Sequence, residues 1–165
     1  MRRLAIAAAA LAVAAAAALV ASRLLSEPAS EEDRIRAAFE EAARAAGEKR
    51  VGDAVAIVSE RFRGQGLDRQ GVKQLVAYQA LRGEWVSVSV AGVEVAVEGE
   101  AARATLDLVL ARSGAGKALA DLLPAEASAW RIECGLEVEE GEWRVVEASW
   151  RPVALAEALS GPAPR

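Results

Sequence analysis

The stretch VSVSVAGVEVAVEGEAARATLDLVL, residues 86–110, decides the fold, because its apolar residues alternate with polar ones. Such a period of two is typical of a strand that buries one face. The valines before Gly92 occupy even positions and those after it occupy odd positions: Val86, Val88, Val90, Val93, Val95 and Val97. A shift of one residue at a glycine predicts a β-bulge, which bends the strand and keeps the same face inward.

Tight turns connect this stretch to further strands. The segment 98–100 predicts a turn into a returning strand that ends near Leu110. Residues 130–138 alternate again, and a turn at 140–141 leads into a last strand at 143–150. Because hairpins join strands of opposite direction, we expect an antiparallel four-stranded sheet.

Three helices are predicted before the sheet. The first begins at a capping box, residues 30–33, and ends at Gly47. A second, shorter helix starts at Asp53, and a third runs from Arg69 to Arg82. The apolar sides of the second and third helices are formed by Val55, Val58 and Phe62 and by Val72, Leu75 and Val76. The predicted fold class is therefore α+β, with three N-terminal helices packed on a strongly bent antiparallel sheet and an N-terminal hydrophobic helix before them.

An uncharged run of eighteen residues, Leu4–Ala21, follows Arg2 and Arg3 at the start of the chain. As a helix it would span about 27 Å, close to the hydrocarbon thickness of a bilayer. The length favours an uncleaved membrane anchor, whereas the alanine-rich composition is also typical of a cleaved signal peptide. A soluble alanine-rich helix is the third alternative. Residues 1–25 are thus predicted to be a membrane anchor or a signal segment.

The charges on either side of this run predict its orientation. Arg2 and Arg3 precede it, and four acids lie within residues 27–33 after it. The positive-inside rule then places the N-terminus in the cytoplasm and the domain on the periplasmic side, or in the periplasm or medium if the segment is cleaved. We expect a linker at 26–29, one domain at 30–152 and a frayed tail at 153–165.

The composition excludes several classes of function. Without Arg2 and Arg3 the chain keeps 18 basic and 24 acidic residues, a net charge of −6. A domain this acidic is a poor nucleic-acid binder, and charge alone does not hold it on an anionic lipid surface. The chain has no histidine and one cysteine, Cys134, so the commonest general base and the commonest metal ligands are missing. We expect no metal and no cofactor.

Helices followed by a long bent sheet give the chain a resemblance to a known superfamily. The segments that carry it are SERFRGQGLDRQGVKQLV (59–76), VSVAGVEVAVEGEAARATLDL (88–108) and GEWRVVEASW (141–150). They resemble the nuclear-transport-factor-2-like superfamily, whose cone-shaped, cystatin-like fold is shared with ketosteroid isomerases and SnoaL-like proteins. The resemblance covers roughly residues 30–152. It implies a fold rather than an activity, because such proteins include enzymes, binding modules and dimerisation domains.

An isomerase of this kind would need an inward carboxylate and a tyrosine or second acid inside the cone. Asp107 lies between Leu106 and Leu108, so its side chain is expected to point away from the core, and Glu133 has the same parity problem. Solvated carboxylates on the outer face are therefore the expected arrangement. The one tyrosine, Tyr78, lies on the third predicted helix.

Trp85, Trp130, Trp143 and Trp150 could line a pocket for a small apolar ligand, although the core or an interface is the favoured place for each of these tryptophans. If the cone binds such a ligand, the candidate lining residues are Tyr78, Trp130, Cys134 and Trp143. Cys134 alternates with strand neighbours and is expected to be a small buried residue rather than a nucleophile. Adjacent Val145 and Val146 suggest apolar residues on both faces of the last strand, and hence a homodimer through the sheet.

The leading interpretation is a membrane-anchored or exported, non-enzymatic binding or assembly domain of the cell envelope. The rival is a small-molecule enzyme of the isomerase or cyclase type that works in the cone. A third hypothesis is a cytosolic protein with an alanine-rich start.

Overall fold

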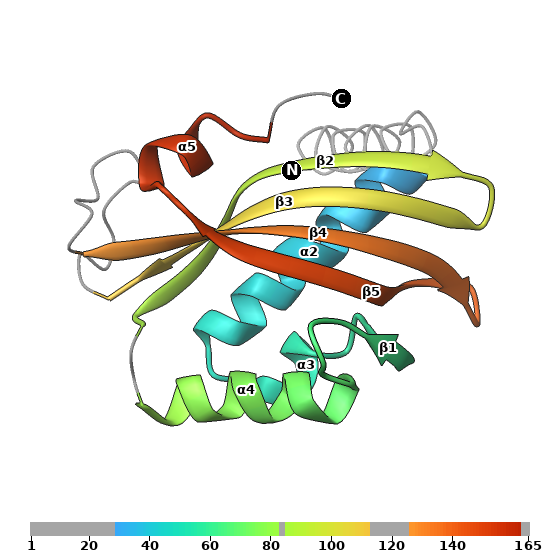
Figure 1. The fold of residues 1–165 in the computed structure, drawn as a ribbon. Coiled ribbons are helices and arrows are strands. Elements are labelled where there is room, and N and C mark those ends of the chain that lie inside the picture. The colour runs from blue at the N-terminus through green and yellow to red at the C-terminus, as the bar shows by residue number, and fades with distance from the viewer. Residues whose placement is uncertain (1–28, 83–84, 113–125, 163–165) are drawn as a thin grey trace, which may run out of the picture. The chain divides into compact units, whose positions relative to one another are not determined.

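The computed structural model describes residues 29–82, 85–112 and 126–162. Its centre is a five-stranded sheet in the order β1-β5-β4-β3-β2 (Figure 1). The strands are β1 (Val58–Arg63), β2 (Ser87–Glu98), β3 (Ala101–Ala111), β4 (Ala127–Glu139) and β5 (Glu142–Val153). The helices are α2 (Glu31–Gly47), α3 (Val51–Ala54), α4 (Arg69–Arg82) and α5 (Leu155–Leu159).

The N-terminal run at 4–21 lies outside the described residues, so the anchor or signal segment remains a prediction. Within the part of the chain that the structure describes, no helix is long and apolar enough to cross a membrane.

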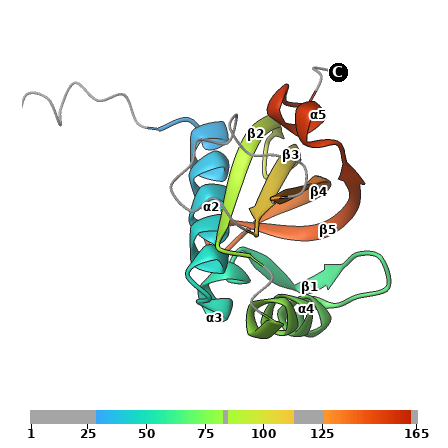
Figure 2. The ribbon, with the colours of Figure 1, turned by 90° about the vertical axis from the view of Figure 1, so that its left-hand side faces the viewer.

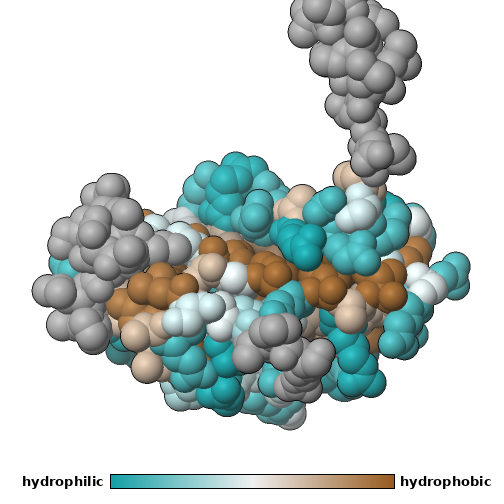
Figure 3. All heavy atoms as spheres, turned by 90° about the horizontal axis from the view of Figure 1, so that it is seen from above, coloured by the Kyte–Doolittle hydropathy of each residue, from teal (hydrophilic) through white to brown (hydrophobic). Residues whose placement is uncertain are grey.

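Strands β2 to β5 form the antiparallel meander that the alternation predicted. In β2, Val90 pairs with Leu108 whereas Gly92 pairs with Asp107, so Ala91 is the extra residue of a bulge. This confirms the bulge predicted at the parity shift. Among the described residues no strand pairs with the other edge of β2, and the valines of β2 are only half-buried. Seen from above, a band of hydrophobic residues runs along β2 (Figure 3).

The second predicted helix is wrong. The helix α3 has only four residues, and the chain from Val58 continues as β1, which pairs in parallel with β5. The backbone N–H of Val145 donates to the carbonyl of Ile57. The edge of β5 that does not pair with β4 thus provides hydrogen-bond partners for this segment. The pairing register is irregular between Val58 and Arg63, and the buried residues Ser59 and Phe62 are three apart. A spacing of three residues between buried side chains is also typical of a helix, which is why the sequence predicted a helix here.

The helix α2 covers one face of the sheet, called the inner face below (Figure 2). Ile35, Phe39 and Ala43 are buried in this helix, and the helical spacing predicts the first two. Ile35 and Phe39 pack against the inward residues of the strands, among them Leu106 and Leu136. This cluster is the main core of the domain.

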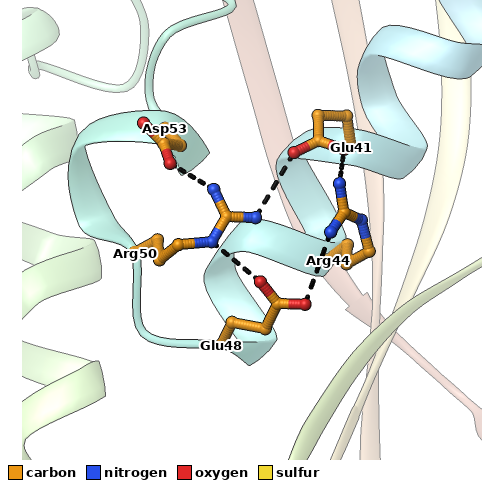
Figure 4. A network of polar contacts seen from close by, with 5 residues as sticks. All are labelled: Glu41, Arg44, Glu48, Arg50 and Asp53. Carbon is orange, nitrogen blue, oxygen red and sulfur yellow. Dashed lines mark hydrogen bonds and ion pairs between the residues drawn. The ribbon is translucent and has the colours of Figure 1, made fainter.

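A network of charges joins the end of α2 to α3 (Figure 4). Arg50 binds Glu41, Glu48 and Asp53, and Arg44 binds both Glu41 and Glu48. The hydrogen bonds that Arg50 donates to Glu48 and Asp53 raise the pKa of its guanidinium above the usual value. The four partners of this network other than Arg50 are solvent-exposed and Arg50 is half-buried, so these ion pairs add little stability.

The opposite, outer face of the sheet is covered at one end by α5, within the segment predicted to be a frayed tail. Ala158 of this helix is fully buried and packs on alanines and Val109 of the outer face. Beside them Asp107 is fully buried, and its two carboxylate oxygens each accept a hydrogen bond of 2.8 Å from Arg131. Arg131 also binds Glu157 of α5 at 2.9 Å. Asp107 therefore points away from the core as predicted, but it is buried in an ion pair rather than solvated.

Replacing Asp107 with alanine should destabilise the domain by about 3–5 kcal/mol, because it leaves the largely buried guanidinium of Arg131 without its main partner. Denaturant unfolding measured by tryptophan fluorescence gives this value. Glu94→Ala on the half-buried edge strand β2 is the control and should change stability by no more than about 0.5 kcal/mol. Equal effects of the two substitutions would contradict the structural role of the ion pair.

Candidate functional site

An apolar pocket of about 220 Å³ lies between the helices and the inner face of the sheet. The sheet contributes its floor. The strand register places Leu106, Ile132 and Trp150 in one row across β3, β4 and β5. The next row contains Ala104, Cys134 and Ala148, whose small side chains fill less of the space. All of these except Ala104 line the pocket.

The walls of the pocket come from α2, β1 and α4. The inner side of α2 presents the small residues Ala42 and Ala46, β1 contributes Phe62, and α4 contributes Val72 and Val76. In α4 no residue is fully buried, so this helix covers the pocket as a thinly packed wall. Leu75 was predicted to face inward, but it is 42% exposed. The pocket thus exists because alanines stand where larger side chains would close the core.

Cys134 is the one ionisable residue among those that line this pocket. Burial raises the pKa of its thiol to about 12, and its Sγ donates toward the carbonyl of Ala104 at 3.6 Å. The lining therefore carries no charge at neutral pH. Glu133 is exposed, and the described residues contain no group of three or more acids and cysteines arranged to hold a metal ion.

The structure separates the four residues that the sequence nominated as pocket lining. Cys134 lines the pocket, whereas the other three are not among its lining residues. Tyr78 is 55% exposed on α4, and its hydroxyl accepts a hydrogen bond from Arg82. Trp143 is buried, and its Nε1 donates to Glu31 at 2.6 Å, which lowers the pKa of that carboxyl. Trp130 is half-buried and pairs with Leu108 and Pro152 on neighbouring strands.

Sequence reasoning missed most of the pocket wall. The alanines of α2 face the pocket only through the folded arrangement, which no local pattern in the sequence shows. Phe62 was placed on a helix that does not exist, so its position beside the pocket was not foreseeable. Trp150 was one of four tryptophans considered for the lining, and it is the one that lies there.

Comparison with solved structures identifies the architecture. An NTF2-like protein with a cystatin-like fold from Novosphingobium aromaticivorans superposes with a TM-score of 0.56 at 18% identity, over 86% of this chain and 93% of that one. An NTF2-like protein of unknown function from Pseudomonas putida KT2440 gives 0.54 at 16%, over 74% and 88%. The chain has the nuclear-transport-factor-2-like fold.

A protein of unknown function with a cystatin-like fold from Nostoc punctiforme gives a TM-score of 0.57 at 9% identity, over 77% of this chain and 96% of that one. These likenesses confirm the fold that the sequence resemblance implied. At such identities they establish the fold alone, and function has to come from the site. Neither a protein-family model nor a curated protein sequence matches this chain.

The buried thiol of Cys134 should resist alkylation in the native protein. With a pKa of about 12, only about one thiol in a thousand is ionised at pH 9, and the side chain is 7% exposed. Iodoacetamide at pH 8–9, followed by mass spectrometry, should modify the native chain at least about a hundredfold more slowly than the chain in denaturant. Equal rates would place Cys134 in solvent and would contradict its burial beside the pocket.

Proposed function

We propose that this chain is a non-enzymatic binding domain that holds a small apolar molecule in the pocket and is attached to a membrane by residues 1–25. The observation that carries the binding role is the pocket itself: about 220 Å³, lined by aliphatic and aromatic side chains and by one neutral thiol. Such a lining favours an uncharged ligand, because a buried charge without a partner is costly.

The position of the polar side chains supports binding rather than acid–base catalysis. A proton transfer within the pocket needs a group that titrates near the working pH and touches the ligand. Asp107 is committed to Arg131 on the outer face, and the hydroxyl of Tyr78 lies at the surface of α4. Cys134 stays protonated at any physiological pH. These placements favour the binding interpretation over an isomerase or cyclase.

The membrane attachment rests on the sequence alone. The run Leu4–Ala21 is long enough to cross a bilayer, and the flanking charges favour a domain outside the cytoplasm. An apolar ligand is scarce in water and abundant in lipid, so a domain attached to a membrane would meet such a molecule where it is concentrated.

The binding role is tested with bromobenzene, whose heavy atom quenches tryptophan fluorescence on contact. The full chain in lipid nanodiscs should show saturable quenching through Trp150, which lines the pocket, and Trp150→Phe should abolish that component. Filling the pocket with Ala148→Leu should weaken binding by about tenfold, which corresponds to about 1.4 kcal/mol.

Ala96→Leu is the matched control, because Ala96 is exposed and lies outside the pocket lining. It should leave bromobenzene binding unchanged. Quenching that is non-saturable, or that Ala148→Leu does not weaken, would refute a ligand site in the pocket. Turnover of a ketosteroid by the chain would instead favour the enzyme.

The attachment is tested by fractionation of cells that produce the full chain. An anchored chain should stay in the membrane pellet after alkaline carbonate extraction and should keep residues 1–25 in mass spectrometry. Leu11→Arg should release a large share of it, because one arginine at the centre of a membrane helix costs about 2.5–3.5 kcal/mol. Ser26→Arg, in the predicted linker, should not. A mature chain that begins near Ser22 would refute the anchor.

A further inference from the structure

The helix α4 exposes apolar side chains that no other described element covers. Five large hydrophobic residues are exposed in the described part of the chain, and four of them lie within residues 75–86: Leu75, Tyr78, Leu81 and Val86. The helix contacts β1 and α3, and its outer side faces away from the domain (Figures 1 and 2). An exposed apolar cluster of this kind marks a surface that binds a partner.

The exposed apolar residues of α4 follow one side of the helix. Tyr78 is three residues from both Leu75 and Leu81, so these side chains are neighbours on the helix surface. Leu81 is 88% exposed and Tyr78 is 55% exposed. The opposite side carries Val72 and Val76, which line the apolar pocket. The helix thus has apolar residues on both sides, whereas a helix that only covers a core presents polar residues to water.

The charged residues on the outer side of α4 are both basic. Lys73 and Arg82 are exposed, and α4 contains no acid, although the chain as a whole is acidic. Arg82 donates a hydrogen bond of 2.7 Å to the hydroxyl of Tyr78 and lies over its ring. The third base of the helix, Arg69, is bound to Glu60. Basic side chains beside exposed leucines and a tyrosine are typical of a helix that lies at an anionic lipid surface.

The outer face of the sheet has no comparable cluster of exposed apolar residues within the part of the chain that the structure describes. The sequence suggested such a face from the adjacent Val145 and Val146. These two valines arise from the bulge in β5, and Val145 faces the core. They therefore do not indicate an apolar outer face, and the homodimer through the sheet stays a prediction.

We propose that the outer side of α4 lies on the surface of an anionic lipid bilayer, with Leu75, Tyr78 and Leu81 inserted among the headgroups. Lys73 and Arg82 then meet the lipid phosphates, and the tyrosine hydroxyl stays at the level of the headgroups. Charge alone does not hold an acidic domain at such a surface, and the three apolar side chains supply the rest of the attraction. The contact brings the pocket within one helix diameter of lipid, about 10 Å.

The contact rests on the proposed membrane attachment, which keeps the domain close to the bilayer. The helix α4 lies near the C-terminal end of α2 (Figure 2), and α2 has 17 residues, so about 25 Å separate α4 from the start of α2. Nine residues lie between Ala21 and Glu31, and an extended segment of that length spans about 30 Å. The attached chain is therefore long enough for α4 to reach the same bilayer, and attachment raises the effective concentration of lipid around it.

A fluorescent label on the outer side of α4 tests the contact. Gln74 is exposed and lies one turn before Tyr78, so a nitrobenzoxadiazole label on Gln74→Cys enters the interface without removing an apolar residue. The full chain is inserted into vesicles of phosphatidylcholine and phosphatidylglycerol. A spin-labelled lipid should then quench this label several-fold more than the same label on Ala96→Cys. Ala96 is exposed about 30 Å along β2 from its first residue. Cys134 is buried and should stay unlabelled in both variants.

Two substitutions in the Gln74→Cys background separate the apolar part of the contact from the charged part. Leu81→Ser should lower the quenching several-fold, whereas Leu159→Ser, at the exposed leucine of α5, should leave it unchanged. Lys73→Glu should remove the additional quenching that phosphatidylglycerol causes over phosphatidylcholine alone. Arg103→Glu makes the same change of charge at an exposed residue of β3 and should not remove it.

The outcomes distinguish the contact from the attachment. A chain that floats with the vesicles but shows equal quenching at positions 74 and 96 keeps its attachment. That result would overturn the lipid contact and leave the exposed side of α4 to a protein partner. Quenching at position 74 that neither phosphatidylglycerol nor Lys73→Glu changes would overturn it as well. A chain that does not float with the vesicles refutes the attachment and, because α4 then fails to hold the domain on lipid, the contact with it.

Discussion

The strands of this domain bend strongly and must still keep one continuous apolar face toward α2. A strand that bends without an extra residue gradually turns its side chains away from the core, and a slip of one residue exposes the whole apolar set. Two bulges resolve this conflict, one at Ala91 in β2 and one at Val146 in β5. Each adds one residue, so the valines and tryptophans on both sides of the bend stay on the inner face.

The bulge in β5 determines which of the following side chains lie on each face of the sheet. On the inner face, Ala148 and Trp150 follow the β5 bulge and line the apolar pocket. On the outer face, Glu147 comes into line with Gly135 and Arg103. The same extra residue thus shapes a neutral cavity on one side and a charged row on the other. Because the charged side chains lie outside the pocket lining, the net charge of the chain does not indicate which molecules would fit the pocket.

The amount of structure that the sequence predicts depends on where each element finds its hydrogen bonds. The helices α2 and α4 form their hydrogen bonds within themselves, and each of the strands β2 to β5 pairs with the next strand in the chain. The periodicity and the turns of the sequence therefore predicted these elements well. The strand β1 pairs with β5, more than eighty residues later, and no local pattern records that partner. The helix α5 is short, and its contacts are all with distant strands: Ala158 is buried among outer-face residues of β3 and β4, and Glu157 binds Arg131. Of the four residues nominated as pocket lining only Cys134 lies there, and neither Trp150 nor the helical wall was nominated.

The parallel pairing of β1 with β5 also sets an order of assembly. The carbonyl of Ile57 accepts its hydrogen bond from Val145. This contact therefore joins two residues that are separated by most of the domain's sequence. Loop closure over such a separation is slow and comes late in folding. Phe62 can take its place beside the apolar pocket only after the last strand has been synthesised, so the wall that β1 contributes is complete only when nearly the whole chain is present.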